Sequence, residues 1–104
     1  MHTQFRRGVI EMCVLSLIYE KDRYGYDIVN ELSDHIDVTK GTVYPILSRL
    51  KKQKLFENYL KESDEGPIRK YYTLTDKGRE YTKELIEGWK VVSAGAQAII
   101  SRIE

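Results

Sequence analysis

The stretch over residues 39–55 constrains the fold of this chain more than any other part of the sequence. Its apolar residues recur at helical spacing, which predicts an amphipathic helix with one buried face. These residues are Val43, Ile46, Leu47 and Leu50. The charged residues of the stretch are all basic: Lys40, Arg49, Lys51, Lys52 and Lys54. The whole chain carries a net charge of only +1, so these five basic residues create a local positive field. A helix of this kind suits the major groove of DNA.

Bulk composition limits the class of protein. At 104 residues the chain has the size of one domain. Its single cysteine, Cys13, excludes an intramolecular disulfide framework. The N-terminal residues do not form a secretory signal, and no apolar run approaches the roughly 20 residues of a membrane span. The sequence therefore predicts a cytoplasmic protein that is not a membrane protein.

The sequence contains no pattern typical of an enzyme or a metal site. The two histidines, His2 and His35, lie far apart in polar segments, and Cys13 lies among apolar residues. The carboxylates are scattered, and no cluster of cysteine and histidine has the spacing of metal ligands. We therefore expect a protein that is not an enzyme, binds no metal and needs no cofactor.

Three helices are expected in the first half of the chain. Apolar residues point almost all round the segment 5–19, which predicts a helix covered on more than one side. Residues 21–23 are typical of a turn, and a second helix is expected over 26–33. Thr39 is a suitable N-cap for the basic helix. Pro45 lies beyond the first turn of that helix, so the helix either starts later or carries a local kink.

Two strands and a last helix complete the pattern. Residues 56–61 and 68–74 are expected as strands joined by a polar turn that contains a Gly-Pro pair. Tyr71 and Tyr72 are expected in the core. Thr75 then caps a helix that can run to the end of the chain. Three helices, a hairpin and a long closing helix predict a mostly α (α+β) fold, a winged helix-turn-helix.

The polar face of the basic helix is expected to contact DNA. It presents small and aromatic groups rather than Asn, Gln or Arg, so direct reading of bases should be sparse. Basic residues at the start of the second strand would hold phosphates. The alternatives are a solvated lysine face and a charged strand edge that prevents aggregation. The expected DNA-binding residues are Thr39, Lys40, Gly41, Thr42, Tyr44, Pro45, Arg49, Lys52, Arg69 and Lys70.

The last helix carries a heptad stripe of apolar residues, which indicates a helix–helix interface. The stripe comprises Leu85, Trp89, Val92, Ala96, Ile99 and Ile103. Gly88 and Gly95 lie beside it and suggest that another backbone or a bulky side chain approaches closely. A partner chain is the simplest cover for so long a stripe, and folding back over the chain's own core is the alternative. We therefore assign residues 1–74 to DNA binding and 75–104 to dimerisation.

Trp89 has two interpretations. As an aromatic residue in the middle of the stripe, it can anchor the interface. Together with Gly88 and Val92, it can instead form the wall of a pocket between subunits, where a small planar apolar effector would stack. The sequence leaves both interpretations open.

Several strings of residues resemble the PadR family of bacterial transcriptional regulators. They are Tyr24-Gly25-Tyr26, residues 41–50, Arg69-Lys70-Tyr71-Tyr72-Thr73-Leu74-Thr75 and Gly78. The single long C-terminal helix is similar to the small subfamily. The resemblance implies a homodimeric winged-helix repressor that binds a near-palindromic operator. It also implies dimerisation through the first and last helices, which adds Ile10, Val14 and Leu17 to the expected interface.

The resemblance bears on three single positions. The family places proline at the position of Pro45. Lys51 stands where the family usually has an acidic residue, and it adds positive charge. Some small-subfamily members resemble multidrug-sensing repressors whose tryptophan lines a pore at the dimer centre, and Trp89 falls at the matching place. We expect a DNA-binding repressor; the alternatives are a repressor that senses a multidrug-like or phenolic ligand, and a winged helix used only for protein interaction.

Overall fold

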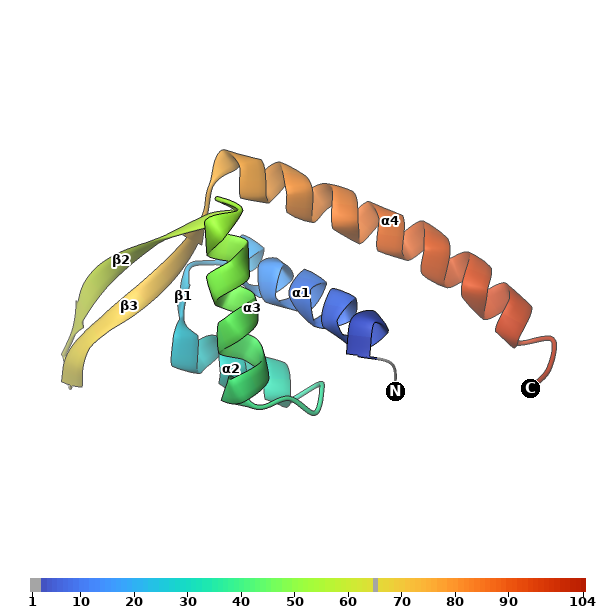
Figure 1. Cartoon of the computed structure of the whole chain (residues 1–104), viewed down its shortest axis with the longest axis horizontal. Coiled ribbons are helices and arrows are strands. Elements are labelled where there is room, and N and C mark those ends of the chain that lie inside the picture. Colours follow the sequence, from blue (N-terminus) through green and yellow to red (C-terminus); the bar gives the residue numbers. More distant parts are fainter. Residues whose placement is uncertain (1–2, 65) are drawn as a thin grey trace.

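The long helix α4 (Asp76–Ile100) determines the shape of the molecule. The structure is a computed structural model that describes residues 3–64 and 66–104, and it extends over 53 × 28 × 22 Å. The 25 residues of α4 form a rod about 37 Å long. Its C-terminal half projects beyond all other elements (Figure 1). Within the two described ranges, no helix has the length and apolar content that crossing a membrane requires.

Helix α1 (Thr3–Glu20) runs through the middle of the fold. In Figure 1, α4 lies above α1, while α2 (Gly25–Ser33) and α3 (Lys40–Lys52) lie below and in front of it. α1 contacts all three of these helices and also the strand β3 (Gly66–Leu74). Its apolar residues are therefore covered from several directions, as the sequence predicts.

The hydrophobic core joins α1, α2, α3 and the base of the sheet. α3 contributes the predicted apolar stripe, in which every residue is buried. From α1 come Ile10 and Val14, which are 1% and 0% exposed. Their expected place at a dimer interface is wrong, because the chain's own core leaves them no surface to offer a partner. Leu17 is only partly buried at the edge of this core.

A three-stranded antiparallel sheet has the order β1-β3-β2, with β1 (Arg23–Tyr24) and β2 (Phe56–Ser63) on either side of β3. We call the β2–β3 hairpin the wing. Its strands run farther toward the tip than expected, because pairing continues past an irregularity after Lys61. Pro67, expected in the turn, therefore lies in β3, near the tip, where a missing N–H is tolerated.

Arg23 explains why the short strand β1 escaped prediction. Residues 21–23 were expected as a turn, but Arg23 is only 3% exposed. Its Nε donates to the Leu17 carbonyl at 2.8 Å, and its two terminal nitrogens bind the carboxylates of Asp27 and Glu20. A buried cation with these partners ties the end of α1 to the start of α2.

The two sides of β3 have different environments. Tyr72 and Leu74 lie in the core at 7% and 8% exposed, and Phe56 packs edge-on against Tyr72 with 5.1 Å between ring centroids. Tyr71 lies on the opposite side of the strand and is only half-buried. Its expected place in the core is therefore wrong.

α3 begins at Lys40, which excludes the later start, one of the two alternatives left open by Pro45. Thr39 takes the predicted N-cap position with an extended backbone, and its carbonyl accepts from the Val43 N–H at 3.1 Å. The side chain of Thr39 makes no capping hydrogen bond. Pro45 lies inside the helix. Because proline has no N–H, the Gly41 carbonyl lacks its usual partner.

The first turn of α4 packs against the turn between α3 and β2 and is hydrogen-bonded to it. Lys54 has a left-handed backbone (φ 62°), and the Leu55 N–H donates to the Leu50 carbonyl at 3.2 Å, which ends α3 in a Schellman motif. The Thr75 hydroxyl donates to the Lys54 carbonyl at 2.8 Å and accepts from the Gly78 N–H at 3.0 Å, which confirms the predicted cap. A β-carbon on Gly78 would lie 1.8 Å from the Leu55 carbonyl oxygen.

Candidate nucleic-acid interface

One face of α3 is exposed and contains no acidic residue. Its exposed members are Gly41, Thr42, Tyr44, Pro45, Ser48, Lys51 and Lys52. Lys40, the first residue of the helix, and the N-cap Thr39 are exposed as well. The side of the helix that its residue spacing assigns to DNA is therefore the side that the fold leaves open.

Arg49 differs from the other residues assigned to DNA on α3. Its guanidinium group forms an ion pair with Glu11 of α1, and the two side chains are 41% and 18% exposed. The expectation of five uncompensated charges is therefore wrong, because the compensating acid comes from another helix. The uncompensated positive field comes from the four lysines, Lys40, Lys51, Lys52 and Lys54.

Tyr44 packs against the start of α2. A β-carbon on Gly25 would lie 2.8 Å from the Tyr44 hydroxyl oxygen and 2.9 Å from its Cε1, so the ring occupies the space that a side chain there would need. The ring remains 41% exposed. Burial, together with the neighbouring Tyr44, raises the pKa of Tyr72. The ring is thus held between α2 and the sheet while one edge faces solvent.

A cleft of about 370 Å³ separates α3 from the wing. It is lined by Tyr24, Gly25, Tyr26, Tyr44, Arg69, Lys70 and Tyr72. The guanidinium carbon of Arg69 lies 4.5 Å from the centre of the Tyr24 ring, a cation–π contact that fixes the cation at the cleft. Lys70 points to the other face of β3 and is exposed. Both wing residues assigned to DNA thus line the same cleft as Tyr44.

Sequence analysis missed a row of tyrosines that crosses the sheet. Tyr24, Tyr71 and Tyr59 are paired across β1, β3 and β2. The Tyr71 ring lies 5.7 Å from the Tyr24 ring and 5.5 Å from the Tyr59 ring. The Tyr59 hydroxyl donates to Asp22 at 2.7 Å, and this hydrogen bond raises the pKa of Tyr59. The row could not be predicted because Tyr24 belongs to it only through the pairing of β1 with β3.

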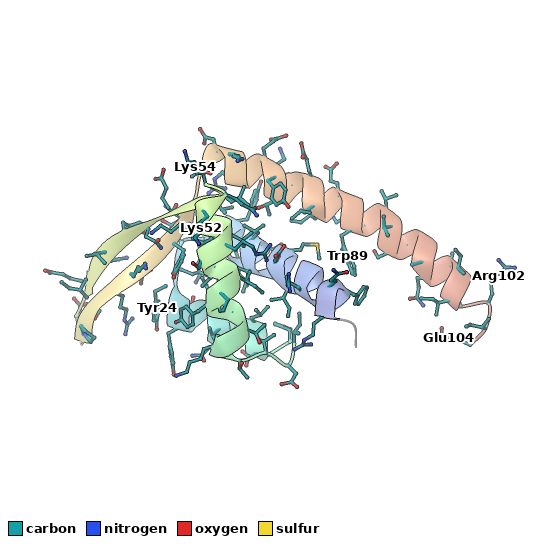
Figure 2. All side chains as sticks on the ribbon, viewed as in Figure 1. Tyr24, Lys52, Lys54, Trp89, Arg102 and Glu104 are labelled. Carbon is teal, nitrogen blue, oxygen red and sulfur yellow. The ribbon has the colours of Figure 1, made fainter. Side chains whose placement is uncertain are left out.

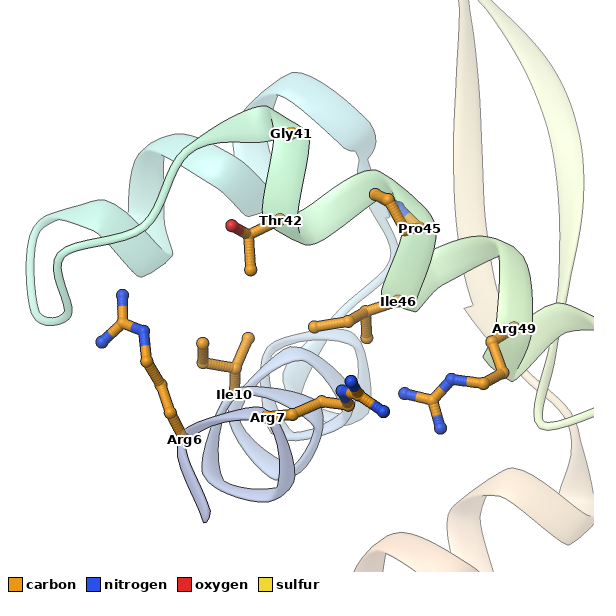
Figure 3. A pocket seen from close by; sticks show the side chains of 8 residues that line it. All are labelled: Arg6, Arg7, Ile10, Gly41, Thr42, Pro45, Ile46 and Arg49. Atoms are coloured by element: carbon orange, nitrogen blue, oxygen red, sulfur yellow. The ribbon is translucent and has the colours of Figure 1, made fainter. Parts of the chain in front are cut away.

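A second cleft, of about 430 Å³, separates α3 from the start of α1 (Figure 3). It is lined by Arg6, Arg7, Ile10, Gly41, Thr42, Pro45, Ile46 and Arg49. Sequence analysis also missed Arg6 and Arg7. Their adjacent positive charges were a signal, but nothing in the sequence places them beside α3.

The three residues of the expected ligand pocket, Gly88, Trp89 and Val92, line a groove between α1 and α4 of about 470 Å³. Trp89 is 42% exposed and faces the N-terminal end of α1 (Figure 2). A β-carbon on Gly88 or Gly95 would meet nothing within 4 Å. Contacts within one chain therefore do not explain these two glycines.

The other reactive groups form no site among residues 3–64 and 66–104. No group of three or more histidine, cysteine or acidic side chains in this part of the chain could hold a metal ion. Cys13 is half-buried, and this burial raises the pKa of its thiol. The most distinctive surface is therefore the exposed face of α3 with a cleft on each side.

Solved structures that resemble this chain include transcriptional regulators. A crystal structure of a PadR-like transcriptional regulator from Bacillus cereus has a TM-score of 0.86 and 40% identity, covering 94% of this chain and 97% of that chain. A Streptococcus transcriptional regulator has a TM-score of 0.87 and 36% identity over 94% and 98% of the two chains. The model of the PadR-like transcriptional regulator family matches residues 14–84. The chain belongs to the PadR-like family.

The PadR-like chain is thus a DNA-binding transcriptional regulator with a winged helix-turn-helix fold. The match over residues 14–84 includes α3, the wing and the first turns of α4. Protein X of Lysinibacillus sphaericus, whose function is not characterised, is 38% identical over an alignment of 90 residues that covers 83% of each chain.

Proposed function

We propose that this PadR-like regulator is a homodimeric repressor that reads a near-palindromic operator with the exposed face of α3. One observation carries the proposal: this face contains no acid and has basic side chains on both flanks. A helix in the major groove meets base edges at its face and phosphates at its sides. Tyr44 and Thr42 would contact bases, while Lys52, Arg69 and Lys70 would contact the backbone.

The start of α3 suits a close approach of DNA. Gly41 is exposed, and the nearest atom to a β-carbon built there is the Thr39 hydroxyl oxygen at 3.5 Å. The open space lets a sugar–phosphate strand come near the helix backbone. Hydroxyl groups and an aromatic edge give few specific hydrogen bonds, so DNA shape and phosphate contacts would carry much of the affinity.

The exposed stripe of α4 supports the homodimer. Val92, Ile99 and Ile103 are 67%, 65% and 88% exposed. A long apolar stripe at heptad spacing is unfavourable in water and is covered by a second copy of the same helix. In this arrangement residues 1–74 bind DNA, residues 75–104 dimerise, and two copies of α3 enter half-sites about 34 Å apart.

The proposed DNA contacts can be tested through the salt dependence of binding. Lys52→Ala and Arg69→Ala should weaken binding to operator and random DNA alike, and reduce the salt slope by about one unit for each phosphate that is no longer bound. Lys90→Ala, an exposed site on α4, is the matched control. An unchanged slope in both variants would remove these residues from the backbone contacts. If the unaltered protein shows no salt-dependent binding, the winged helix serves only protein interaction.

A second function, ligand sensing, is favoured by the groove beside Trp89. The groove is lined mainly by apolar groups, including Phe5, Leu85 and Val92, and a flat apolar effector could stack on the indole. Such a ligand would release DNA only by favouring one spacing of the two wings. Titration with planar cations and phenolic acids should quench Trp89 fluorescence and weaken operator binding. Quenching without loss of DNA affinity would indicate a pocket without a switch, and no quenching would indicate a packed seam.

A further inference from the structure

The cleft between α1 and α3 concentrates positive charge beside the exposed face of α3. Figure 3 shows Arg7 and Arg49 extending toward one another, with Arg6 on the far side of Ile10. Among the described residues that line this cleft, none is acidic. Glu11 pairs with Arg49 and lies one helical turn from Arg7, so three guanidinium groups stand against one carboxylate and the cleft keeps an excess of positive charge.

The cleft also includes the first turn of α3. Gly41, Thr42 and Pro45 belong both to its lining and to the exposed face of the helix. The first N–H groups of any helix have no partner within the helix, and they make its start attractive to anions. Here the Thr39 side chain does not cap them. An oxyanion in the cleft would therefore meet two guanidinium groups, the Thr42 hydroxyl and the positive end of α3.

The position of the cleft distinguishes DNA from a free anion. The wing cleft, with Arg69 and Lys70, lies on one flank of α3, and the cleft with Arg6 and Arg7 lies on the other. A helix in the major groove has one phosphate strand on each side. If only the wing held phosphates, the opposite strand would have Lys40 as its one basic partner on α3 near the start of that helix.

We infer that Arg6 and Arg7 form a second phosphate-binding site, which holds the DNA strand opposite the one that the wing holds. Arg49 is a positioning residue: its ion pair with Glu11 fixes α3 against α1 at this cleft. The inference rests on the proposed reading of DNA by α3, and it adds a contact from outside the helix-turn-helix and the wing.

The test compares Arg6→Gln, Arg7→Gln and the double variant with Lys83→Gln, a matched control on an exposed face of α4. Binding of the full-length protein to a random-sequence duplex is measured over a series of salt concentrations. Removal of one phosphate-binding side chain should reduce the slope by about 0.9 and the affinity at 0.1 M salt about eightfold. The double variant should bind roughly sixtyfold more weakly. Thermal unfolding checks that each variant remains folded.

The outcomes separate this inference from the proposed function. If the unaltered protein binds DNA with a steep salt slope and the folded double variant keeps that slope and affinity, the second phosphate site is overturned. If the unaltered protein shows no salt-dependent affinity at all, the proposed function fails first. A further arm uses inorganic pyrophosphate at constant ionic strength without DNA. Saturable stabilisation at micromolar pyrophosphate that is abolished in Arg7→Gln would indicate a small-anion site instead and overturn the assignment to DNA.

Discussion

The ring of Tyr44 lies against Gly25 so closely that a β-carbon on the glycine would be 2.8 Å from the phenolic oxygen. The contact joins the first residue of α2 to the exposed face of α3. The ring of Tyr44 is therefore oriented by its packing against the buried backbone of Gly25. A base-reading side chain held in this way loses little conformational freedom on binding DNA.

Gly25→Ala should displace the Tyr44 ring and reduce discrimination between operator and random DNA. The added methyl group must move the ring, and the cost in the free energy of unfolding should be small because the clashing atoms lie at the far end of an exposed side chain. Tyr44→Ala should lose discrimination in the same way, whereas Tyr44→Phe keeps the ring and tests the hydroxyl alone. Affinities for both DNAs are measured by titration. An equal fall in both would show that Tyr44 does not read bases.

Lys54→Gly should stabilise the protein. Lys54 has φ 62°, a left-handed conformation that costs a residue with a side chain about 1–2 kcal/mol. Glycine adopts it freely and is the usual residue at this position of a Schellman motif. The melting temperature should rise by several degrees. Lys51→Gly, inside α3, is the control and should lower it. No gain for Lys54→Gly would mean that the lysine makes a compensating contact.

Gly78→Ala should be strongly destabilising. Its β-carbon would lie 1.8 Å from the Leu55 carbonyl oxygen, and a backbone atom cannot move aside as a side chain can. We expect a loss of about 3 kcal/mol or more in the free energy of unfolding. Glu80→Ala, at an exposed position of the same helix, is the control. Urea denaturation measures both, and equal stabilities would contradict the contact.

Val92→Asp should convert the proposed dimer into monomers. The charge enters the apolar stripe of α4, where desolvation would oppose association. Ala94→Asp places the same charge on the exposed opposite side of the helix and should remain dimeric. Sedimentation at several concentrations gives the mass of each variant. A dimeric Val92→Asp protein would exclude this stripe as the interface.

Alkaline pH should weaken the sheet through Tyr59. The hydrogen bond to Asp22 raises the pKa of Tyr59 in the folded protein. The stabilisation is therefore full below the ordinary tyrosine pKa of about 10 and is lost as pH rises through the folded value. Unfolding free energies measured on both sides of this range should fall less steeply for Tyr59→Phe. Tyr72, whose pKa is also raised, supplies part of the remaining decline, and identical slopes would refute the role of Tyr59.

The sequence predicted the elements whose signal is local. The stripe from Val43 to Leu50 predicted which side of α3 is buried, and Thr75 predicted the start of α4. The predictions that were wrong or missing concern residues whose contacts come from other elements of the fold. Arg23 is typical of a turn in the sequence, but in the fold its guanidinium group is buried and donates to three acceptors. Glu11 compensates Arg49 only because α1 and α3 are packed together. Arg6 and Arg7 lie more than thirty residues from Thr42, which shares their cleft.

The contact between Gly78 and Leu55 makes the start of α4 a pivot attached to the end of α3. Because Thr75 and Lys77 also bind the carbonyls of Lys54 and Gln53, α4 cannot tilt without moving this turn. For a lever arm of about 37 Å, a tilt of about 5° displaces the far end by about 3 Å while the pivot hardly shifts. A large displacement at the C-terminal end of α4 therefore produces only a small rotation at the end of α3.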